Sequence, residues 1–326
     1  MATINGDQNW FFRDDELTGT SARDYIYGLE GKDRLFGLGD RDHLYGGNGD
    51  DRLYGGAGND TLDGGNHNDV LFGDGGNDTL LGGWGDDRMY GGADNDTFRD
   101  LNGNDRMDGG TGIDTVDYSE FYGQVIANLA NGTARQEEAI YRVNSGMEFH
   151  SIGTDTLVSI ENIKGGLFDD RLTGSSANNR IEGGAGNDTL NGAGGHDLIM
   201  GGLGRDVMTG GTGNDTFLFN TQTTGSNTSV DQITDFRPVD DVIHLDDAIF
   251  TALERGELAA DAFKIVETAR PTGLDADDRI IVSAWNGIVY YDADGSGSQA
   301  AVAVVDLDIG QPGVLNSLSA ADFFVV

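Results

Sequence analysis

Aspartate recurs at a fixed spacing along two stretches of this sequence. Divided into rows of nine residues, segment 19–117 gives eleven rows and segment 165–218 gives six, and the sixth residue is aspartate in sixteen of the seventeen rows. Carboxylates repeated in this way can supply oxygen ligands to a hard cation such as Ca²⁺, which takes six to eight oxygens. The candidate metal ligands are therefore Asp24, Asp33, Asp42, Asp51, Asp60, Asp69, Asp78, Asp87, Asp96, Asp105, Asp114, Asp170, Asp188, Asp197, Asp206 and Asp215.

The other fixed places of each row must position these carboxylates. The first residue is glycine in sixteen rows, and the two segments hold 40 of the 53 glycines of the chain. Glycine allows turns with positive φ and lets the backbone approach an ion closely. The eighth residue is apolar in every row. Because side chains alternate along a strand, this residue should face a thin core while the seventh and ninth point outward.

The rows resemble the RTX family of glycine-rich nonapeptide-repeat proteins. Residues 46–54 (GGNGDDRLY) and 55–63 (GGAGNDTLD) match its GGxGxDxUx pattern in full. The resemblance implies an all-β fold, a parallel β-roll with six turn residues and three strand residues in each row, and two rows in each coil. It also implies that the sixth-place aspartates and turn carbonyls share Ca²⁺ with the row one coil further on. Weak sites are expected at four departures from the pattern, His67, Asp94, Asp100 and Asn179.

Composition limits the possible functions and favours a cation partner. The chain has 56 acidic and 20 basic side chains, a formal net charge of −36, and no cysteine. These values exclude disulfides and thiolate metal sites, and they argue against nucleic-acid binding, which needs a basic surface. If rows one coil apart share an ion, the two segments hold about thirteen Ca²⁺ ions, which would offset most of the charge. We expect the chain to be disordered in a calcium-poor cytosol and to fold outside the cell.

The breaks in the period suggest five parts. These are an N-terminal cap (1–18), a first roll (19–117), a β spacer (118–164), a second roll (165–218) and a C-terminal capping domain (219–326). Strands are predicted in the spacer at 125–129, 140–143 and 156–163, where Glu161 and Ile163 fall on the sixth and eighth places of a row. In the last part we predict a capping strand pair at 231–236 and 240–245, helices at 247–255 and 259–263, and strands at 279–283, 288–291 and 301–307.

The two ends of the sequence suggest how the chain is exported. The N-terminus lacks the basic and apolar regions of a cleavable signal peptide. Residues 320–326 place an acid before an apolar end, which resembles the uncleaved C-terminal signal of type I secretion substrates. We therefore expect export by type I secretion machinery and a secreted, extracellular or cell-surface location. No apolar stretch approaches the roughly 20 residues that span a bilayer.

A second acidic motif lies in the predicted C-terminal domain. The run from Asp292 to Gly297, with a further acid at Asp294, resembles the start of an EF-hand loop but lacks its downstream bidentate glutamate. Either an additional calcium-linked turn or a polar hairpin loop fits this pattern.

Alternate rows should lie on the same sheet, so their outward side chains should stack about 4.8 Å apart. This places an aromatic row beside an arginine row on one face of the first roll. The face stabilises its own sheet, packs against another part of the chain, or binds an acidic polysaccharide or a second copy of the protein. Its residues are Arg34, Phe36, Arg52, Tyr54, Phe72, Arg88 and Tyr90.

No catalytic motif is evident. The HExxH and GxSxG patterns are absent, and the five histidines are scattered. The sequence thus predicts a calcium-binding protein that is not an enzyme, with a structural or adhesive role at the cell surface or in a matrix. The alternatives are a diffusible exoprotein that acts on host or competitor cells and a hydrolase with an unrecognised site.

Overall fold

The computed structural model describes residues 1–6, 14–100, 102–142, 146–221, 230–297, 299–308 and 317–326. The chain divides into two units, Met1–Lys164 and Gly165–Val326. Both are built from β-strands, and among the residues described the helical elements with defined bounds are two short 3₁₀ turns, η1 (Ala260–Ala262) and η2 (Ala320–Asp322). The predicted all-β class is confirmed. In the described part of the chain, no helix is both long and apolar enough to cross a bilayer.

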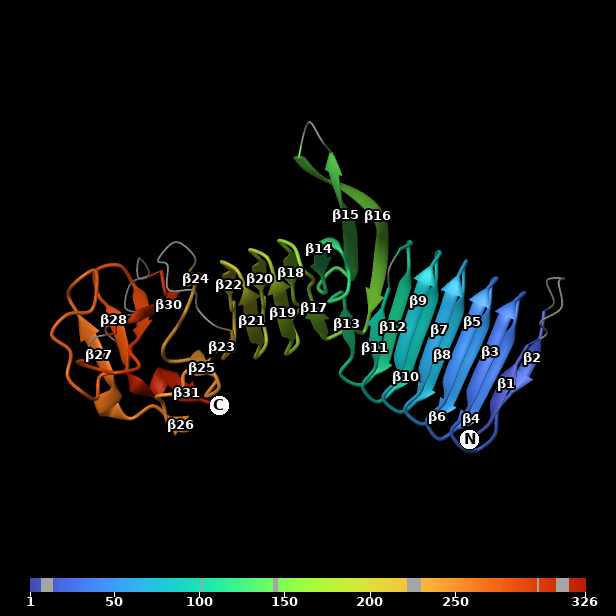
Figure 1. Cartoon of the computed structure of the whole chain (residues 1–326), viewed down its shortest axis with the longest axis horizontal. Coiled ribbons are helices and arrows are strands. Elements are labelled where there is room, and N and C mark those ends of the chain that lie inside the picture. The colour runs from blue at the N-terminus through green and yellow to red at the C-terminus, as the bar shows by residue number, and fades with distance from the viewer. Residues whose placement is uncertain (7–13, 101, 143–145, 222–229, 298, 309–316) are drawn as a thin grey trace. The chain divides into compact units, whose positions relative to one another are not determined.

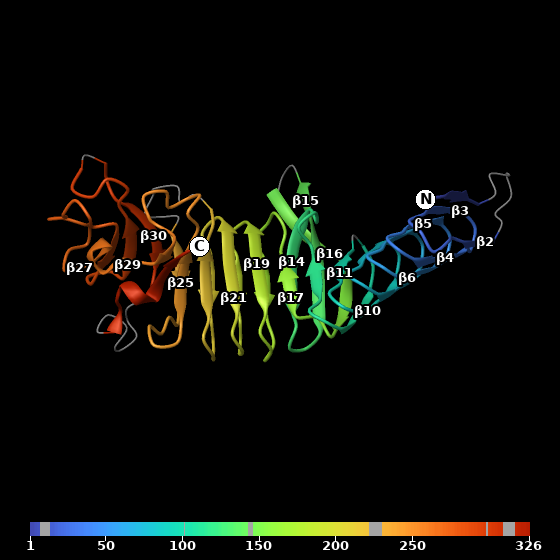
Figure 2. The same ribbon diagram turned by 90° about the horizontal axis from the view of Figure 1, so that it is seen from below.

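The first unit is a parallel β-roll in which successive rows alternate between two sheets (Figures 1 and 2). One sheet contains β1 (Thr3–Asn5), β3 (Tyr25–Glu30), β5 (His43–Asn48), β7 (Thr61–Asn66), β9 (Thr79–Trp84), β11 (Thr97–Arg99), β13 (Thr115–Asp117) and β17 (Asn162–Lys164). The other contains β2 (Glu16–Thr18), β4 (Arg34–Gly39), β6 (Arg52–Ala57), β8 (Val70–Gly75), β10 (Arg88–Ala93), β12 (Arg106–Thr111) and β16 (Gly146–Val158).

The nine-residue period sets the register of both sheets. Residues eighteen apart are paired, so Leu35, Leu53 and Leu71 lie opposite one another on consecutive strands. Each of these side chains is completely buried, as the apolar eighth place predicts. Each sheet contributes one stack of such side chains to the core, so each row buries one apolar side chain and the stabilising apolar area is small.

Most strands of the first roll are longer than the three residues expected. β6 runs through the seventh to ninth places of one row and the first three of the next, and Gly56 and Ala57 still pair with Asp74 and Gly75. The second place of the row adopts positive φ within this longer strand, 103° at Gly56. Asp74 adopts φ of 71° at the same place although it has a side chain, so the turn itself imposes this conformation.

The segment between the two series of rows forms a hairpin and then rejoins the first roll. β14 (Gly123–Asn128) and β15 (Thr133–Arg142) are antiparallel, and β15 pairs with β16 (Figure 1). The end of β16 lies beside β12, with Leu157 opposite Met107, and β17 lies beside β13, with Ile163 opposite Val116. The strand predicted at 140–143 lies within β15 as far as Arg142, and Val143 is outside the described residues.

The second unit continues the same pattern over fewer rows. Two strands cap its rows as predicted, because Ile233 lies opposite Met208 and Ile243 lies opposite Phe217. One sheet holds β19 (Arg180–Ala185), β21 (Leu198–Leu203), β23 (Thr216–Phe219), β25 (Val242–Leu245), β31 (Phe323–Val325) and β26 (Gly256–Glu257). The other holds β18 (Arg171–Thr173), β20 (Thr189–Asn191), β22 (Val207–Thr209), β24 (Asp231–Ile233), β30 (Val302–Asp306), β29 (Ile288–Tyr291), β28 (Ile280–Ser283) and β27 (Phe263–Val266).

The last part of the chain contains one wrong prediction. The three strands predicted there correspond to β28, β29 and β30, and the helix predicted at 259–263 is the 3₁₀ turn η1. The helix predicted at 247–255 is instead a series of turns, in which the Phe250 N–H bonds to the Asp246 carbonyl and the Leu253 N–H to the Phe250 carbonyl. So short a segment has little helical stability of its own. The contact between the buried Phe250 ring and Tyr291 holds the segment in the series of turns instead.

Candidate metal-binding turns

The sixth-place aspartates form a hydrogen-bonded ladder inside each roll. The Asp42 N–H donates to Asp60 Oδ1 at 2.7 Å, and the Asp60 N–H donates to Asp78 Oδ1 at the same distance. The same bond joins residues eighteen apart throughout both series of rows. All sixteen predicted ligands are buried, with at most 2% of their surface exposed. The structure thus places every one of them at an equivalent position.

The second oxygen of most of these carboxylates has a different environment. It is buried, yet within the described part of the chain it accepts no hydrogen bond. Leaving a buried carboxylate oxygen without a donor is costly, so such an oxygen needs a proton or a cation nearby. This applies to Oδ2 of Asp33, Asp42, Asp51, Asp60, Asp69, Asp78, Asp87, Asp96, Asp105, Asp114, Asp188, Asp197, Asp206 and Asp215.

Two predicted ligands differ because of the backbone at the second place of their rows. Asp24 Oδ2 accepts the Thr20 N–H, and Asp170 Oδ2 accepts the Gly166 N–H, both at 2.6 Å. Neither Thr20 nor Gly166 has positive φ. The row of Asn179 has no aspartate at the sixth place, and the Asn179 Oδ1 accepts the Ser175 N–H. In all remaining rows whose second residue is described, that residue has positive φ and the Oδ2 of the aspartate accepts no hydrogen bond. The conformation of one turn residue thus decides whether the carboxylate is satisfied by the protein.

Carbonyl oxygens lie beside the same carboxylates. A Cβ atom added to Gly55 would lie 2.6 Å from Asp60 Oδ2 and 2.9 Å from the carbonyl oxygen of Gly73, one coil further on. At Gly55 a side chain would therefore crowd both oxygens. Carboxylate and carbonyl oxygens are the ligands that Ca²⁺ prefers, so the residues of the turn fit this ion.

Burial raises the pKa of these carboxyl groups. Desolvation raises the pKa of Asp51 to about 7 and that of Asp69 and Asp78 to about 8, and the negative charges of neighbouring aspartates add to the effect. Burial raises the pKa of Asp105 well above the ordinary aspartate value, and the nearby Asp100 carboxyl group adds to the rise. At Asp24, burial is outweighed by the hydrogen bonds from Thr20 and Ala2, and its pKa is lowered.

At the end of the first roll, protein side chains donate hydrogen bonds to the second carboxylate oxygen, which accepts none in most of the other turns described. Asp155 takes the sixth place after Asp105, whose N–H it accepts at 3.3 Å. Its Oδ2 accepts hydrogen bonds from the Tyr118 hydroxyl at 3.0 Å and from Gln136 Nε2 at 3.1 Å, and all three side chains are buried. This last carboxylate therefore needs no cation at Oδ2. Sequence reasoning missed Asp155, although residues 153–157 (GTDTL) match the second half of a row.

An arginine supplies hydrogen-bond donors at the end of the second series of rows. Arg237 Nη2 donates to the carbonyl oxygens of Gly211 at 2.7 Å and Gly213 at 3.2 Å. Its guanidinium also lies 3.9 Å from the Asp241 carboxylate, which occupies the sixth place after Asp215. The positively charged guanidinium of Arg237 thus binds turn carbonyl oxygens directly. In most other turns, carbonyl oxygens lie beside a carboxylate instead.

The fifth place of the row has a structural role that sequence reasoning did not assign. The Asn77 N–H donates to Asn59 Oδ1 at 3.1 Å, and the Asn95 N–H donates to Asn77 Oδ1 at 2.9 Å. These exposed bonds tie each turn to the next one. The recurring Asn-Asp-Thr triplets of the sequence were the available signal.

The acidic loop near the C-terminus is a tight polar turn. Asp292 is buried and its Oδ1 accepts the Asp294 N–H at 3.1 Å, while Gly295 has φ of 64°. Asp294 Oδ2 accepts the Gln299 N–H at 3.0 Å. A calcium-linked turn at this loop stays a prediction.

The raised pKa values predict how the calcium-free chain responds to pH. A carboxyl group whose pKa in the folded state lies above the ordinary aspartate value of 3.8 stabilises the fold, and this stabilisation is complete below pH 3.8. This stability is lost as pH rises through the folded values of about 6 to 8. We expect calcium-free protein to resist urea better at about pH 4 than at about pH 8, measured by circular dichroism. Equal or greater resistance at the higher pH would contradict this.

In millimolar Ca²⁺ the pH dependence of the resistance to urea should reverse, because protons then compete with the ion for the carboxylates.

Comparison with known proteins agrees with these turns. A family model described as the RTX calcium-binding nonapeptide repeat matches residues 12–44, 45–80, 81–116, 164–199 and 192–220. No curated protein matches the sequence. The AlgE6R3 subunit of the Azotobacter vinelandii mannuronan C5-epimerase is a similar solved structure, with 26% identity, a TM-score of 0.30, and coverage of 48% of this chain and 78% of that one. The extracellular lipase LipA of Serratia marcescens is 19% identical, with a TM-score of 0.30 and coverage of 82% of this chain and 40% of that one. The matched segments contain both series of rows, and the chain belongs to the family of proteins with RTX calcium-binding nonapeptide repeats.

Proposed function

We propose that the chain is an extracellular protein whose main activity is calcium binding coupled to its own folding, and that it is not an enzyme. The observation that carries this proposal is the series of fourteen buried carboxylate oxygens that accept no hydrogen bond from the described residues. Each costs free energy in the folded chain until a cation or a proton occupies the turn. In a calcium-poor cytosol at neutral pH the fold lacks this compensation. At the millimolar calcium found outside cells it gains one ion for each pair of stacked turns.

Circular dichroism during calcium titration tests the coupling. We expect a change from a coil spectrum to a β spectrum between micromolar and millimolar Ca²⁺, the range in which extracellular modules bind the ion. A chelator added afterwards should reverse it. The same titration with Mg²⁺ is the control, since this smaller ion gives up its water reluctantly and should induce little structure. A full β spectrum in excess chelator at neutral pH would contradict the proposal.

We also propose an adhesive role in which one face of the first roll binds an acidic polysaccharide. The rings of Phe36, Tyr54, Phe72 and Tyr90 are stacked with centroids 4.9–5.0 Å apart, so the predicted aromatic row exists. Arg34, Arg52 and Arg88 lie exposed beside it, and the Arg34 guanidinium lies 5.2 Å from the centre of the Phe36 ring. Aromatic rings pack against sugar rings and guanidinium groups bind carboxylates. These observations favour adhesion over the diffusible exoprotein and hydrolase alternatives.

Substitutions on the two sheets of the first roll can test this face. Changing Arg52, Tyr54, Arg88 and Tyr90 to alanine should lower retention on an immobilised acidic polysaccharide by about tenfold or more, because both contacts are lost. The matched control changes Tyr25, Tyr27, His43 and Tyr45 to alanine, which removes the stacked rings of the opposite sheet. Retention should then stay the same in calcium. Equal retention by both variants would contradict the polysaccharide proposal, and a change in oligomeric state of the first variant alone would indicate self-association.

We further propose that residues 320–326 direct export by type I secretion machinery. In the folded chain Phe323 and Val325 are buried on β31, which lies between β25 and β26 in its sheet. Its role in export therefore has to be separated from its role in folding.

Deletion of residues 320–326 should leave the protein inside the producing cell. The control is Leu53→Ala, which disturbs the core of the first roll but leaves the C-terminus intact. Because the chain is expected to travel unfolded, this variant should still reach the medium. The measurement is the amount of protein in the cell and medium fractions. Normal export of the deleted chain would show that the signal lies elsewhere.

A further inference from the structure

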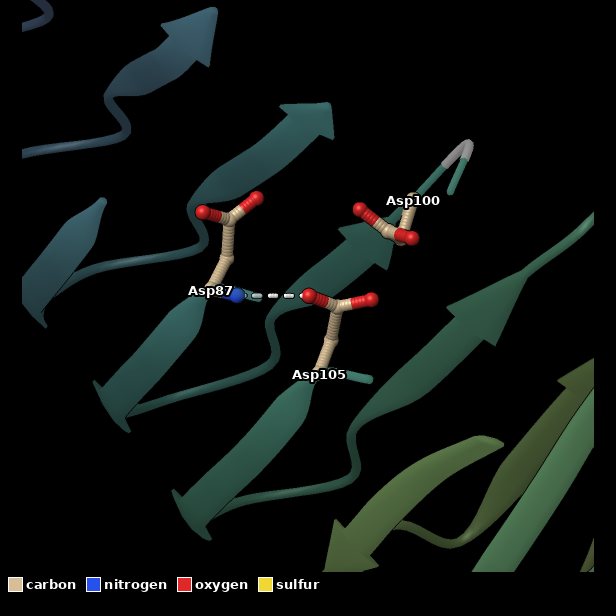
Figure 3. Close-up of side chains that lie close together, drawn as sticks. All are labelled: Asp87, Asp100 and Asp105. Carbon is tan, nitrogen blue, oxygen red and sulfur yellow. Dashed lines mark hydrogen bonds between the residues drawn. The ribbon is translucent and has the colours of Figure 1, made fainter. Parts of the chain in front are cut away.

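Asp100 is the one first-place residue of the seventeen rows that is not glycine. Its side chain is turned into the roll, with 3% of its surface exposed. Figure 3 shows its carboxylate gathered with those of Asp87 and Asp105, which end two successive turns of the same stack. The side chain that was expected to weaken this turn therefore lies within it.

The position of Asp100 can be compared with an ordinary row. A Cβ atom on Gly73 would lie 2.3 Å from Asp78 Oδ2 and 2.6 Å from the carbonyl oxygen of Gly91, the first residue one coil further on. On Gly82 the equivalent Cβ would lie 2.6 Å from Asp87 Oδ2 and 2.7 Å from Asp100 Oδ1. The carboxylate of Asp100 thus takes the place that the carbonyl oxygen of Gly91 has beside Gly73.

The result is a group of three buried carboxylates. Asp87, Asp100 and Asp105 each offer an oxygen, and these oxygens lie within 4.8 Å of one another. Asp87 Oδ2 and Asp105 Oδ2 accept no hydrogen bond from the residues described, and both side chains are at least 98% buried. Three negative charges this close repel strongly in a low-dielectric interior unless a cation lies between them. A full charge at the third ligand position also attracts a divalent ion more strongly than a carbonyl dipole does.

We propose that Asp87, Asp100 and Asp105 form a three-carboxylate Ca²⁺ site that fills at lower free calcium than the other turns of the chain. This inference rests on the proposed calcium-binding function, and it assigns Asp100 as a ligand at a place where the repeat pattern has glycine. Loss of its charge should affect the first ion bound far more than the later ones.

Equilibrium dialysis of the full chain with radioactive Ca²⁺ can test the site at the low-calcium end of the folding transition, where the first ion binds. Asp100→Asn removes the charge and keeps the shape, while Asp100→Gly restores the residue of the repeat pattern. Both should weaken binding of the first ion by about tenfold or more, equivalent to about 1.4 kcal/mol. Asp94→Asn is the matched control, since it removes one acidic charge from the preceding turn but its side chain is exposed. It should bind the first ion as the unsubstituted chain does.

The outcome for glycine separates the two interpretations of Asp100. If Asp100→Gly binds the first ion as tightly as the unsubstituted chain, or more tightly, Asp100 is only a defect in the repeat and the inference is overturned. If the unsubstituted chain binds no Ca²⁺ even at millimolar concentration, the proposed function fails together with the inference. Circular dichroism in millimolar Ca²⁺ should show that all variants reach the same folded state, so that a loss of affinity is not a loss of folding.

Discussion

Each aspartate of the repeat provides two oxygens with different tasks. One oxygen accepts the amide hydrogen of the aspartate one coil away, as in the bond between Asp42 and Asp60, and so connects the coils. The other is buried beside glycine and accepts no hydrogen bond from the described residues in fourteen of the sixteen. The residue that builds the ladder therefore creates the need for a cation, and burial of the carboxylate cannot be separated from binding. The thin core, one apolar side chain per row, offers little to compensate for an empty turn.

Backbone conformation decides which turns carry this need. Where the second residue of a row has positive φ, as at Gly56 and Asp74, the carboxylate of that row is left without a donor. At Thr20 the amide hydrogen points to Asp24 and satisfies it. At the last coils of the two rolls, side chains supply the donors. The Tyr118 hydroxyl donates to Asp155, and the Arg237 guanidinium donates to turn carbonyls. The rolls thus begin and end on groups that the protein satisfies itself, and the oxygens without donors lie between them.

The repeat made much of this predictable. A constant spacing fixes register, so the stacking of Leu35 on Leu53 and of Phe36 on Tyr54 follows from the sequence. The six-residue strands and the satisfied carboxylate of Asp24 did not follow, because both depend on the backbone conformation of the turn, and this chain departs from the pattern's second glycine at residues such as Thr20. Asp155 was missed because a hairpin interrupts the phase before the roll resumes. The turns in place of a helix near Phe250 reflect a tertiary contact with Tyr291, which local sequence cannot reveal.

Anomalous X-ray scattering from crystals of the calcium-loaded protein would test the central claim most directly, because it locates each ion by element. The account predicts Ca²⁺ beside the Oδ2 atoms of stacked aspartates such as Asp60 and Asp78, and none at Asp155 Oδ2, which Tyr118 and Gln136 already satisfy. Water molecules in place of ions at the Oδ2 atoms of a fully folded chain would contradict it.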